Sequence, residues 1–217
     1  MENSNHFNVI VIGAGISGIG AGYYLKKNCP NKSFCIIEGR ENIGGTWDLF
    51  RYPGIRSDSD MFTLGYAFKP WKEQKTIANG PSILNYLEET VEENNLRKKI
   101  TFSHKVLSAN WNSGSQKWEV RAVHHEQEIL LTANFLFMGT GYYNYDEGYT
   151  PDFNDLNKYE GKLIHPQKWP EDYDYTDKKM VVIGSGATAA TIIPELSKKS
   201  ETCHDVAALT DILFPKS

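Results

Sequence analysis

The feature that most constrains the fold is a glycine-rich turn between an apolar strand and a helix near the start of the chain. Residues 7–12 are almost continuously apolar and β-branched, which predicts a buried parallel strand. Gly13, Gly15 and Gly18 follow with the spacing GxGxxG, and apolar residues then recur at helical intervals. Residues 34–38 form a second apolar run. The chain therefore opens with a βαβ unit, which predicts an α/β fold with a parallel sheet.

Each glycine of this turn has a physical role in binding a dinucleotide. Gly13 allows the tight turn, Gly15 lets a pyrophosphate approach the backbone, and Gly18 lets helix and strand pack closely. The free N–H groups and the positive dipole of the helix N-terminus favour phosphate. Glu38 ends the next strand about twenty positions after Gly18, where a carboxylate can accept hydrogen bonds from ribose hydroxyls. A turn that binds nothing is the alternative, and the strand, helix and acid together argue against it.

A second unit of the same kind lies near the other end of the chain. The apolar residues 180–183 predict a strand, and the following helix is expected to end near Lys199. Between them stands a GxGxxA turn made of Gly184, Ser185, Gly186, Ala187, Thr188 and Ala189. Two such units suggest two dinucleotides, one tightly bound and one exchanged. This favours a flavoprotein that takes a hydride from a nicotinamide.

The region between the two units is predicted to contain a helix and an antiparallel meander. Pro81 opens the helix, at a position where a missing N–H costs nothing. Its buried stripe is expected to be Ile83, Leu84, Leu87 and Val91. The predicted meander strands are residues 100–112, 117–124 and 128–138. Residues 39–79 form a long irregular stretch whose aromatic content favours a functional loop.

Composition excludes several classes of partner. A net charge of -4 gives no electrostatic case for nucleic acid or for an anionic membrane. The apolar stretches are too short to span a bilayer, and no secretory signal is recognised. The cysteines Cys29, Cys35 and Cys203 lack metal-ligand spacing, so we expect free thiols, no metal site and a cytoplasmic location.

One segment indicates the subclass. It consists of Gly44-Gly45-Thr46-Trp47-Asp48-Leu49 followed by Arg51-Tyr52-Pro53-Gly54-Ile55-Arg56-Ser57-Asp58. This resembles the GGTW…RYPGxRxD segment of Baeyer–Villiger and related class B flavin monooxygenases. In flavin disulfide reductases a cysteine of a redox pair follows the corresponding GGT, and here Trp47 stands in its place. Without a dithiol to receive its electrons, a reduced flavin would have oxygen as its natural acceptor.

A second signature supports the same resemblance. Tyr159, Gly161, His165, Trp169 and Pro170 have the spacing of the FxGxxxHxxxW(P/D) fingerprint of these enzymes, with Tyr replacing the usual Phe. The resemblance implies that His165 supports cofactor-driven motion at a domain linkage rather than acting as a base. Within the family, the ethionamide-activating monooxygenase subfamily is the most similar, also over residues 58–65 and 141–149.

The resemblance implies a set of site residues. The FAD site would be lined by Ser17, Glu38, Thr46, Trp47, Asp48, Leu49, Asp58 and Val106, with Val106 meeting the adenine through its backbone. A plain strand residue remains the alternative for Val106. Arg56, Ser57 and Asp58 would face the nicotinamide, and residues 184–189 would hold the NADPH pyrophosphate. Asp58 and His165 are the candidate catalytic residues.

The expected organisation follows from these assignments. Residues 1–147 would form a Rossmann-like FAD-binding domain with a β-meander, and residues 148–177 a linker that carries the fingerprint. Residues 178–199 would begin a Rossmann-like NADPH-binding domain. Residues 200–217 read as a divergent tail, with no recognisable next strand and no basic residue for the 2′-phosphate. Because the family's members are more than twice as long, truncation or a frameshift is the simplest account.

The activity implied by the resemblance is NADPH-dependent monooxygenation. One oxygen atom of O2 would enter a ketone, a thioether or thioamide sulfur, or a nitrogen centre through a flavin peroxide. The alternative is a truncated flavin-binding fragment that performs no chemistry alone. Every motif in the sequence concerns cofactor binding, so both functions agree with it.

Overall fold

The computed structural model describes residues 5–206, which divide into two compact units. Of the described residues, the first unit comprises 5–49, 66–70 and 81–143, and the second comprises 50–65, 71–80 and 144–206. Each unit contains one β-sheet and one of the two glycine-rich turns.

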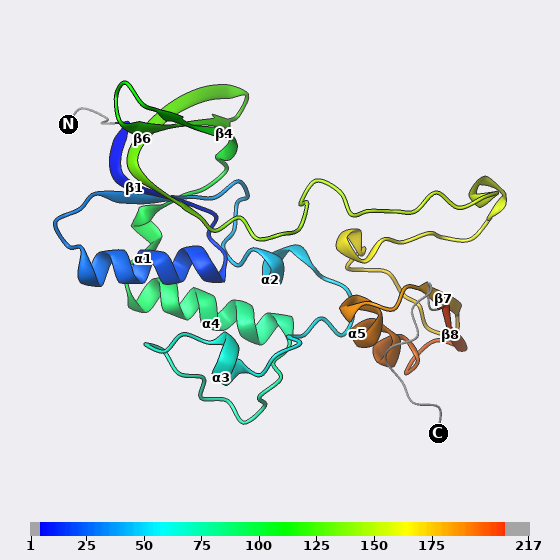
Figure 1. The fold of residues 1–217 in the computed structure, drawn as a ribbon. Helices are drawn as coiled ribbons and strands as arrows, with labels where there is room; N and C mark the ends of the chain where they lie inside the picture. Colours follow the sequence, from blue (N-terminus) through cyan, green and yellow to red (C-terminus); the bar gives the residue numbers. More distant parts are fainter. Residues whose placement is uncertain (1–4, 207–217) are drawn as a thin grey trace. The chain divides into compact units, whose positions relative to one another are not determined.

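The first unit is built on a six-stranded sheet with the order β3-β2-β1-β6-β5-β4 (Figure 1). Its strands are β1 (His6–Ile12), β2 (Phe34–Ile37), β3 (Ile100–Thr101), β4 (Lys105–Asn112), β5 (Lys117–His124) and β6 (Gln127–Met138). β3, β2, β1 and β6 run parallel, whereas β6, β5 and β4 form an antiparallel meander. The α/β fold, the opening βαβ unit and the meander predicted from the sequence are confirmed.

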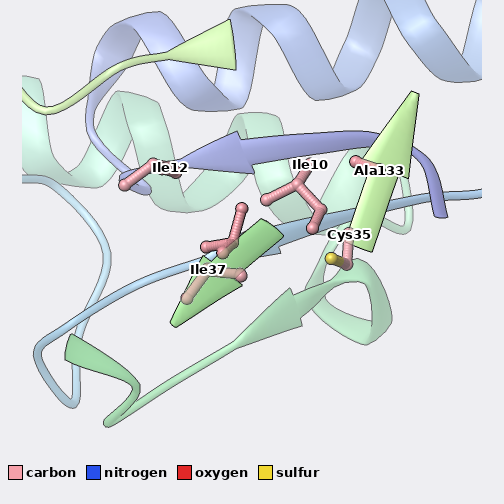
Figure 2. Close-up of a cluster of buried hydrophobic side chains, with 6 residues drawn as sticks. Ile10, Ile12, Cys35, Ile37 and Ala133 are labelled. Carbon is pink, nitrogen blue, oxygen red and sulfur yellow. The ribbon is translucent and has the colours of Figure 1, made fainter. Parts of the chain in front are cut away.

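β6 belongs to both parts of this sheet. Its first half pairs with β5 up to Ala133, and its second half pairs with β1 from Thr132 to Met138. The main core cluster lies where the two parts face each other, and its buried members are Ile10, Ile12, Cys35, Ile37, Val120 and Ala133 (Figure 2). Side chains alternate between the faces of a strand, so residues two apart on β1 and on β2 point into the same core.

Two helices of the first unit, α1 (Ile16–Asn28) and α4 (Gly80–Glu93), run side by side (Figure 1). α1 lies so close to the sheet that a Cβ at Gly22 would be 2.7 Å from Ile36 Cδ1. The stripe predicted for α4 is confirmed at three positions, because Ile83, Leu87 and Val91 are fully buried. The fourth, Leu84, is partly buried and packs against Gly44.

The strand predicted over residues 100–112 is interrupted, so that prediction is wrong in detail. β3 ends at Thr101 and β4 begins at Lys105. Between them, Ser103 has a left-handed φ of 56°, and its N–H donates to the Arg40 carbonyl at 2.9 Å. The next N–H, of His104, donates to the Glu38 carbonyl at 2.9 Å. These bonds to the end of β2 bend the chain away from the sheet edge, where a continuous strand would have extended it.

The second unit contains β7 (Lys179–Ile183), α5 (Ala187–Leu196) and β8 (Thr202–Val206). β8 pairs parallel with β7 along all five residues of each strand. The sequence after Lys199 predicted no strand, and that prediction is wrong. Cys203, His204 and Asp205 interrupt the apolar pattern by which a strand is recognised in a sequence. The strand forms nevertheless, because its backbone pairs with that of β7. Residues 207–217 of the predicted tail lie outside the described residues.

The remaining elements are short. The first unit also contains α2 (Thr46–Leu49) and η1 (Arg97–Lys99), and the second contains α3 (Met61–Leu64), η2 (Leu156–Lys158) and η3 (Pro166–Lys168). Among the described residues, no helix has the length and apolar character needed to cross a membrane. Cys29, Cys35 and Cys203 are free thiols, as expected from the sequence.

Candidate functional site

The three glycines of the first turn have different surroundings. Gly13 has a φ of +99°, and a Cβ there would lie 2.5 Å from the Gly139 carbonyl oxygen. A Cβ at Gly18 would overlap the carbonyl oxygen of Gly13. In contrast, the nearest atom to a Cβ at Gly15 would be Gly45 Cα, at an ordinary 3.7 Å. Gly13 and Gly18 are therefore required by the fold, whereas the space beside Gly15 is open to a ligand.

The N-terminus of α1 can receive an anion. Gly15 is its N-cap and provides no side-chain hydrogen bond, and the first turn contains no acidic residue. Ser17 is exposed on that turn. The first N–H groups of a helix have no partner within the helix, and its dipole places partial positive charge there. The arrangement suits a phosphate group.

Glu38 is held against this turn by two backbone hydrogen bonds. Its side chain is buried, Oε2 accepts from the Ala14 N–H at 2.7 Å, and Oε1 accepts from the Arg40 N–H at 2.9 Å. Bonds of this kind to a carboxylate are strong and hold the buried charge in place. Each oxygen keeps a further lone pair, which can accept from a ribose hydroxyl.

The GGTW segment meets the same turn. The Gly44 N–H donates to the Ala14 carbonyl at 3.0 Å, and α2 begins directly after Gly45. Thr46, Trp47 and Leu49 are partly buried, whereas Asp48 is buried. The two motifs that the sequence analysis assigned to the flavin therefore lie together in the first unit.

Arg40 is a residue of this site that the sequence analysis missed. Its Nη2 lies 2.8 Å from Oδ2 of the buried Asp48, and its Nη1 lies 3.4 Å from the Gly45 carbonyl. The guanidinium thus links the end of β2 to α2 and neutralises the buried carboxylate of Asp48. Only its position two residues after Glu38 could have suggested this role.

Val106 lies at the start of β4, and its side chain packs against the core cluster. It pairs with Ala122, and the register between β4 and β5 shifts between Val106 and Ser108. The hydrogen bond from His104 to Glu38 places the start of β4 beside the end of β2. The structure thus brings Val106 and the Glu38 segment to one end of the sheet.

The second turn leaves similar open space. Gly184 has a φ of +143° and its N–H donates to the Val206 carbonyl at 3.1 Å. Within residues 5–206, and apart from the adjacent residues of the chain, no atom lies within 4 Å of a Cβ built at Gly184 or at Gly186. Gly186 is the N-cap of α5 and forms no side-chain cap. Ser185 stands in the turn, and Ala187, Thr188 and Ala189 begin the helix.

The RYPGIRSD segment packs against α5 in the second unit. The Tyr52 hydroxyl lies 3.3 Å from Thr191 Oγ1, and Gly54 lies against the Thr191 carbonyl. Further along, Ser57 is buried and its N–H donates to the Ala78 carbonyl at 2.9 Å. The residues on either side of it, Arg56 and Asp58, are exposed. Their charged side chains are therefore accessible to a ligand.

The fingerprint forms a turn joined to an earlier segment of the same unit. His165 Nδ1 accepts from the Gln167 N–H at 3.1 Å, and its ring lies against Gly148. The Gln167 amide donates to the Asn144 carbonyl at 2.7 Å, and Trp169 is buried. Because Nδ1 accepts a hydrogen bond, the neutral ring of His165 carries its proton on Nε2. The imidazole thus shapes this turn.

A shallow cavity of about 470 Å³ lies beside the fingerprint. Its lining is charged and aromatic and consists of Arg51, Pro53, Trp169, Glu171, Asp172, Tyr173, Asp174, Tyr175 and Lys199. Arg51 pairs with Glu171 at 3.9 Å, and the Lys199 ammonium lies over the Tyr175 ring. Hydrogen bonding of Asp174 with the Thr176 side chain, and then with the Thr176 N–H, lowers the pKa of the Asp174 carboxyl. These groups are engaged with one another, so we assign the cavity no ligand.

Two glycine-rich turns, each between a parallel strand and an uncapped helix, define an α/β protein of the dinucleotide-binding class. The model of the family described as flavin-binding monooxygenase-like (FMO-like) matches residues 6–207. The chain therefore belongs to the flavin-binding monooxygenase-like family.

Individual relatives agree with this family. The chain is 54% identical over 193 residues to the FAD-containing monooxygenase EthA of Mycolicibacterium smegmatis, covering 89% of this chain and 39% of EthA. It is similar to the oxidized steroid monooxygenase bound to NADP, with a TM-score of 0.80, 30% identity and coverage of 92% and 38% of the two chains. For OTEMO in complex with FAD and NADP the TM-score is 0.79, with 29% identity and coverage of 93% and 38%. The chain thus spans about two fifths of the length of these relatives.

Proposed function

We propose that this chain provides the FAD site and part of the NADPH site of a flavin monooxygenase. The observation that carries the proposal is the meeting of three features in the first unit: the open position at Gly15, the Glu38 carboxylate and the GGTW segment. In this proposal residues 1–147 bind FAD, residues 148–177 link the domains and residues 178–199 begin the NADPH-binding domain.

The described residues fit a bound FAD. Glu38 would accept hydrogen bonds from the ribose, and the N–H groups beside Ser17 would bind the pyrophosphate. Thr46, Trp47, Asp48 and Leu49 would border the flavin, and the Val106 backbone would meet the adenine. When bound, the flavin would accept a hydride from NADPH and deliver one oxygen atom of O2 to a substrate.

The second unit would hold the nicotinamide cofactor. Residues 184–189 would bind the NADPH pyrophosphate at the N-terminus of α5. The exposed side chains of Arg56 and Asp58 would flank the nicotinamide, with Ser57 between them. Asp58 would orient the reacting groups, and His165 would maintain the turn that carries Trp169.

The cysteines support oxygen rather than a dithiol as the electron acceptor. Trp47 stands where the disulfide reductases have a cysteine, and Cys35 is buried in β2. Burial raises the pKa of the Cys35 thiol to about 12, so it remains protonated at neutral pH. We propose a ketone, or a sulfur or nitrogen centre, as the substrate. The three free thiols also fit a reducing cytoplasm.

The test uses the purified protein, supplied with FAD and NADPH. We expect flavin absorbance after purification, anaerobic bleaching by NADPH, and one oxygenated product per NADPH after air is admitted with a ketone or a thioether. Turnover that requires a dithiol and stops when the cysteines are alkylated would contradict the proposal. Flavin binding without oxygenated product would instead support the non-catalytic alternative.

A further inference from the structure

A buried chain of hydrogen bonds runs from Tyr52 into α5. Tyr52 and Thr191 are both 5% exposed, and their hydroxyl oxygens lie 3.3 Å apart. Thr191 Oγ1 also lies 3.1 Å from the Ala187 carbonyl and 3.0 Å from the Thr188 carbonyl. Carbonyl oxygens can only accept, and the Thr191 hydroxyl has a single proton. Thr191 therefore donates that proton to a helix carbonyl, and its oxygen accepts the proton of the Tyr52 hydroxyl. The chain of bonds ends on the first turn of α5, directly after the second glycine-rich turn.

Gly54 makes an independent contact with the same helix. Its φ is +84°, and a Cβ there would overlap the Thr191 carbonyl oxygen and lie 2.7 Å from Glu195 Cγ. A side chain would therefore be both strained and obstructed at this position. The segment is thus held on α5 by a hydrogen bond at Tyr52 and by close backbone packing at Gly54.

This attachment connects two groups of residues that the proposed function assigns to one cofactor. Arg56 and Asp58 follow Gly54 by two and four positions, and they are exposed on either side of the buried Ser57. The pyrophosphate turn, residues 184–189, lies at the other end of the chain of bonds. Arg56, Asp58 and this turn belong to the same compact unit.

We propose that Tyr52 and Thr191 are positioning residues for NADPH, an inference that rests on the proposed function. By joining the Arg56–Asp58 segment to the first turn of α5, they set the spacing between the groups that meet the nicotinamide and those that meet the pyrophosphate. A site that is ordered before binding loses less conformational freedom when the ligand binds, and so binds it more tightly. The effect should be larger for NADPH than for FAD, because the flavin turn, Glu38 and the GGTW segment lie in the other unit.

The experiment measures the Kd for NADP+ by calorimetry on the FAD-loaded protein. Tyr52→Phe removes only the hydroxyl, and we expect the Kd to rise roughly 3- to 10-fold, the effect of one lost buried hydrogen bond. FAD affinity should change less than NADP+ affinity. Thr191→Val should raise the Kd for NADP+ by a similar factor. Thr191→Ser keeps the hydroxyl, so its Kd should stay close to the wild-type value. Tyr149→Phe is the matched control, because Tyr149 is 86% exposed.

The double variant separates positioning from general loosening of the fold. If the two hydroxyls act through one bond, Tyr52→Phe combined with Thr191→Val should weaken NADP+ binding no more than either change alone. A Kd for Tyr52→Phe within twofold of the wild-type value would overturn the inference and leave the proposed function intact. Equal loss of FAD and NADP+ together with a lower Tm would also overturn it. If the wild-type protein does not bind NADP+, both proposals fail.

Discussion

At the residue scale, the first turn separates two uses of glycine that look identical in the sequence. Gly18 has no space for a side chain because the Gly13 carbonyl occupies it, whereas a Cβ at Gly15 meets only Gly45 at 3.7 Å. Gly18 thus allows helix and strand to pack closely, whereas Gly15 keeps the backbone accessible to a pyrophosphate.

Alanine substitutions should distinguish these two uses. We expect Gly18→Ala to lower the free energy of unfolding of the apoprotein by at least about 1–3 kcal/mol, because the methyl group overlaps backbone. Gly15→Ala should cost at most about 1 kcal/mol, as for an N-cap change, yet weaken FAD binding about tenfold or more. Urea unfolding and flavin titration measure the two effects. Equal stability of the two variants would show that the close approach at Gly18 is not real.

Glu38 combines a structural role with the proposed ligand role. Glu38→Ala removes the acceptor of the Ala14 and Arg40 N–H groups as well as the partner of the ribose. We expect FAD affinity to fall by about 1.5–3 kcal/mol, the effect of a lost bond to a charged group, and the apoprotein to be destabilised. Flavin absorbance after dialysis measures the first effect. Glu41→Ala, at an exposed position nearby, should retain the flavin fully; equal retention by Glu38→Ala would exclude Glu38 as the ribose ligand.

At the element scale, β2 is enclosed on both of its faces. Phe34, Cys35, Ile36 and Ile37 are all buried, with the meander core on one side and α1 on the other. A thiol in this position is a small apolar side chain, and its ionisation would place an unpaired charge in the core.

The burial of Cys35 predicts a loss of stability at alkaline pH. Its pKa is raised from 9.0 to about 12, so above pH 9 the unfolded chain releases a proton that the folded chain retains. Stability that is fully present below pH 9 should therefore fall by up to about 1.4 kcal/mol per pH unit as the pH rises towards 12. The raised pKa values of Tyr66 and Tyr86 act in the same direction.

A variant isolates the contribution of the thiol. Urea unfolding at pH 8 and pH 10.5 should show a smaller pH-dependent loss for Cys35→Ala than for the wild-type chain. Cys29→Ala, at a partly exposed position, provides the control for removing a thiol. If Cys35→Ala and the wild type lose the same free energy between the two pH values, Cys35 ionises as freely in the folded state as in the unfolded state.

At the scale of the whole molecule, large apolar side chains of β6 remain in contact with solvent. Phe135 is 69% and Met138 is 60% exposed, in the half of the strand that pairs with β1 after its pairing with β5 has ended at Ala133. Exposed apolar patches of this kind promote association.

Replacing one of these side chains should improve solubility with little effect on stability. For the 217-residue chain we expect Phe135→Thr to change the free energy of unfolding by about 0.5 kcal/mol or less, as for other surface positions, and to reduce light scattering at high concentration. Ile10→Ala on β1 should instead cost about 2–5 kcal/mol, because Ile10 is fully buried. A loss of several kcal/mol for Phe135→Thr would mean that this face is covered in solution.

Local pattern was sufficient for most of the first unit. The apolar runs of residues 7–12 and 34–38, and the alternating strands of the meander, are properties of consecutive side chains. Their predictions are confirmed within a residue or two at β1, β2, β5 and β6. The break at Ser103 was not predictable in this way, because hydrogen bonds to the distant Arg40 and Glu38 segments produce it.

The sequence by itself determined the α/β class, the two dinucleotide-binding turns and the family signatures, since these depend on the spacing of residues close together in the chain. Only the tertiary structure decided which distant residues support them. It joined Arg40 to Asp48, added β8 to β7 although its residues lack an apolar pattern, and placed Tyr52 on Thr191, 139 positions away. Such contacts depend on which distant elements pack against each other. The periodicity of residues along the chain carries no information about that packing.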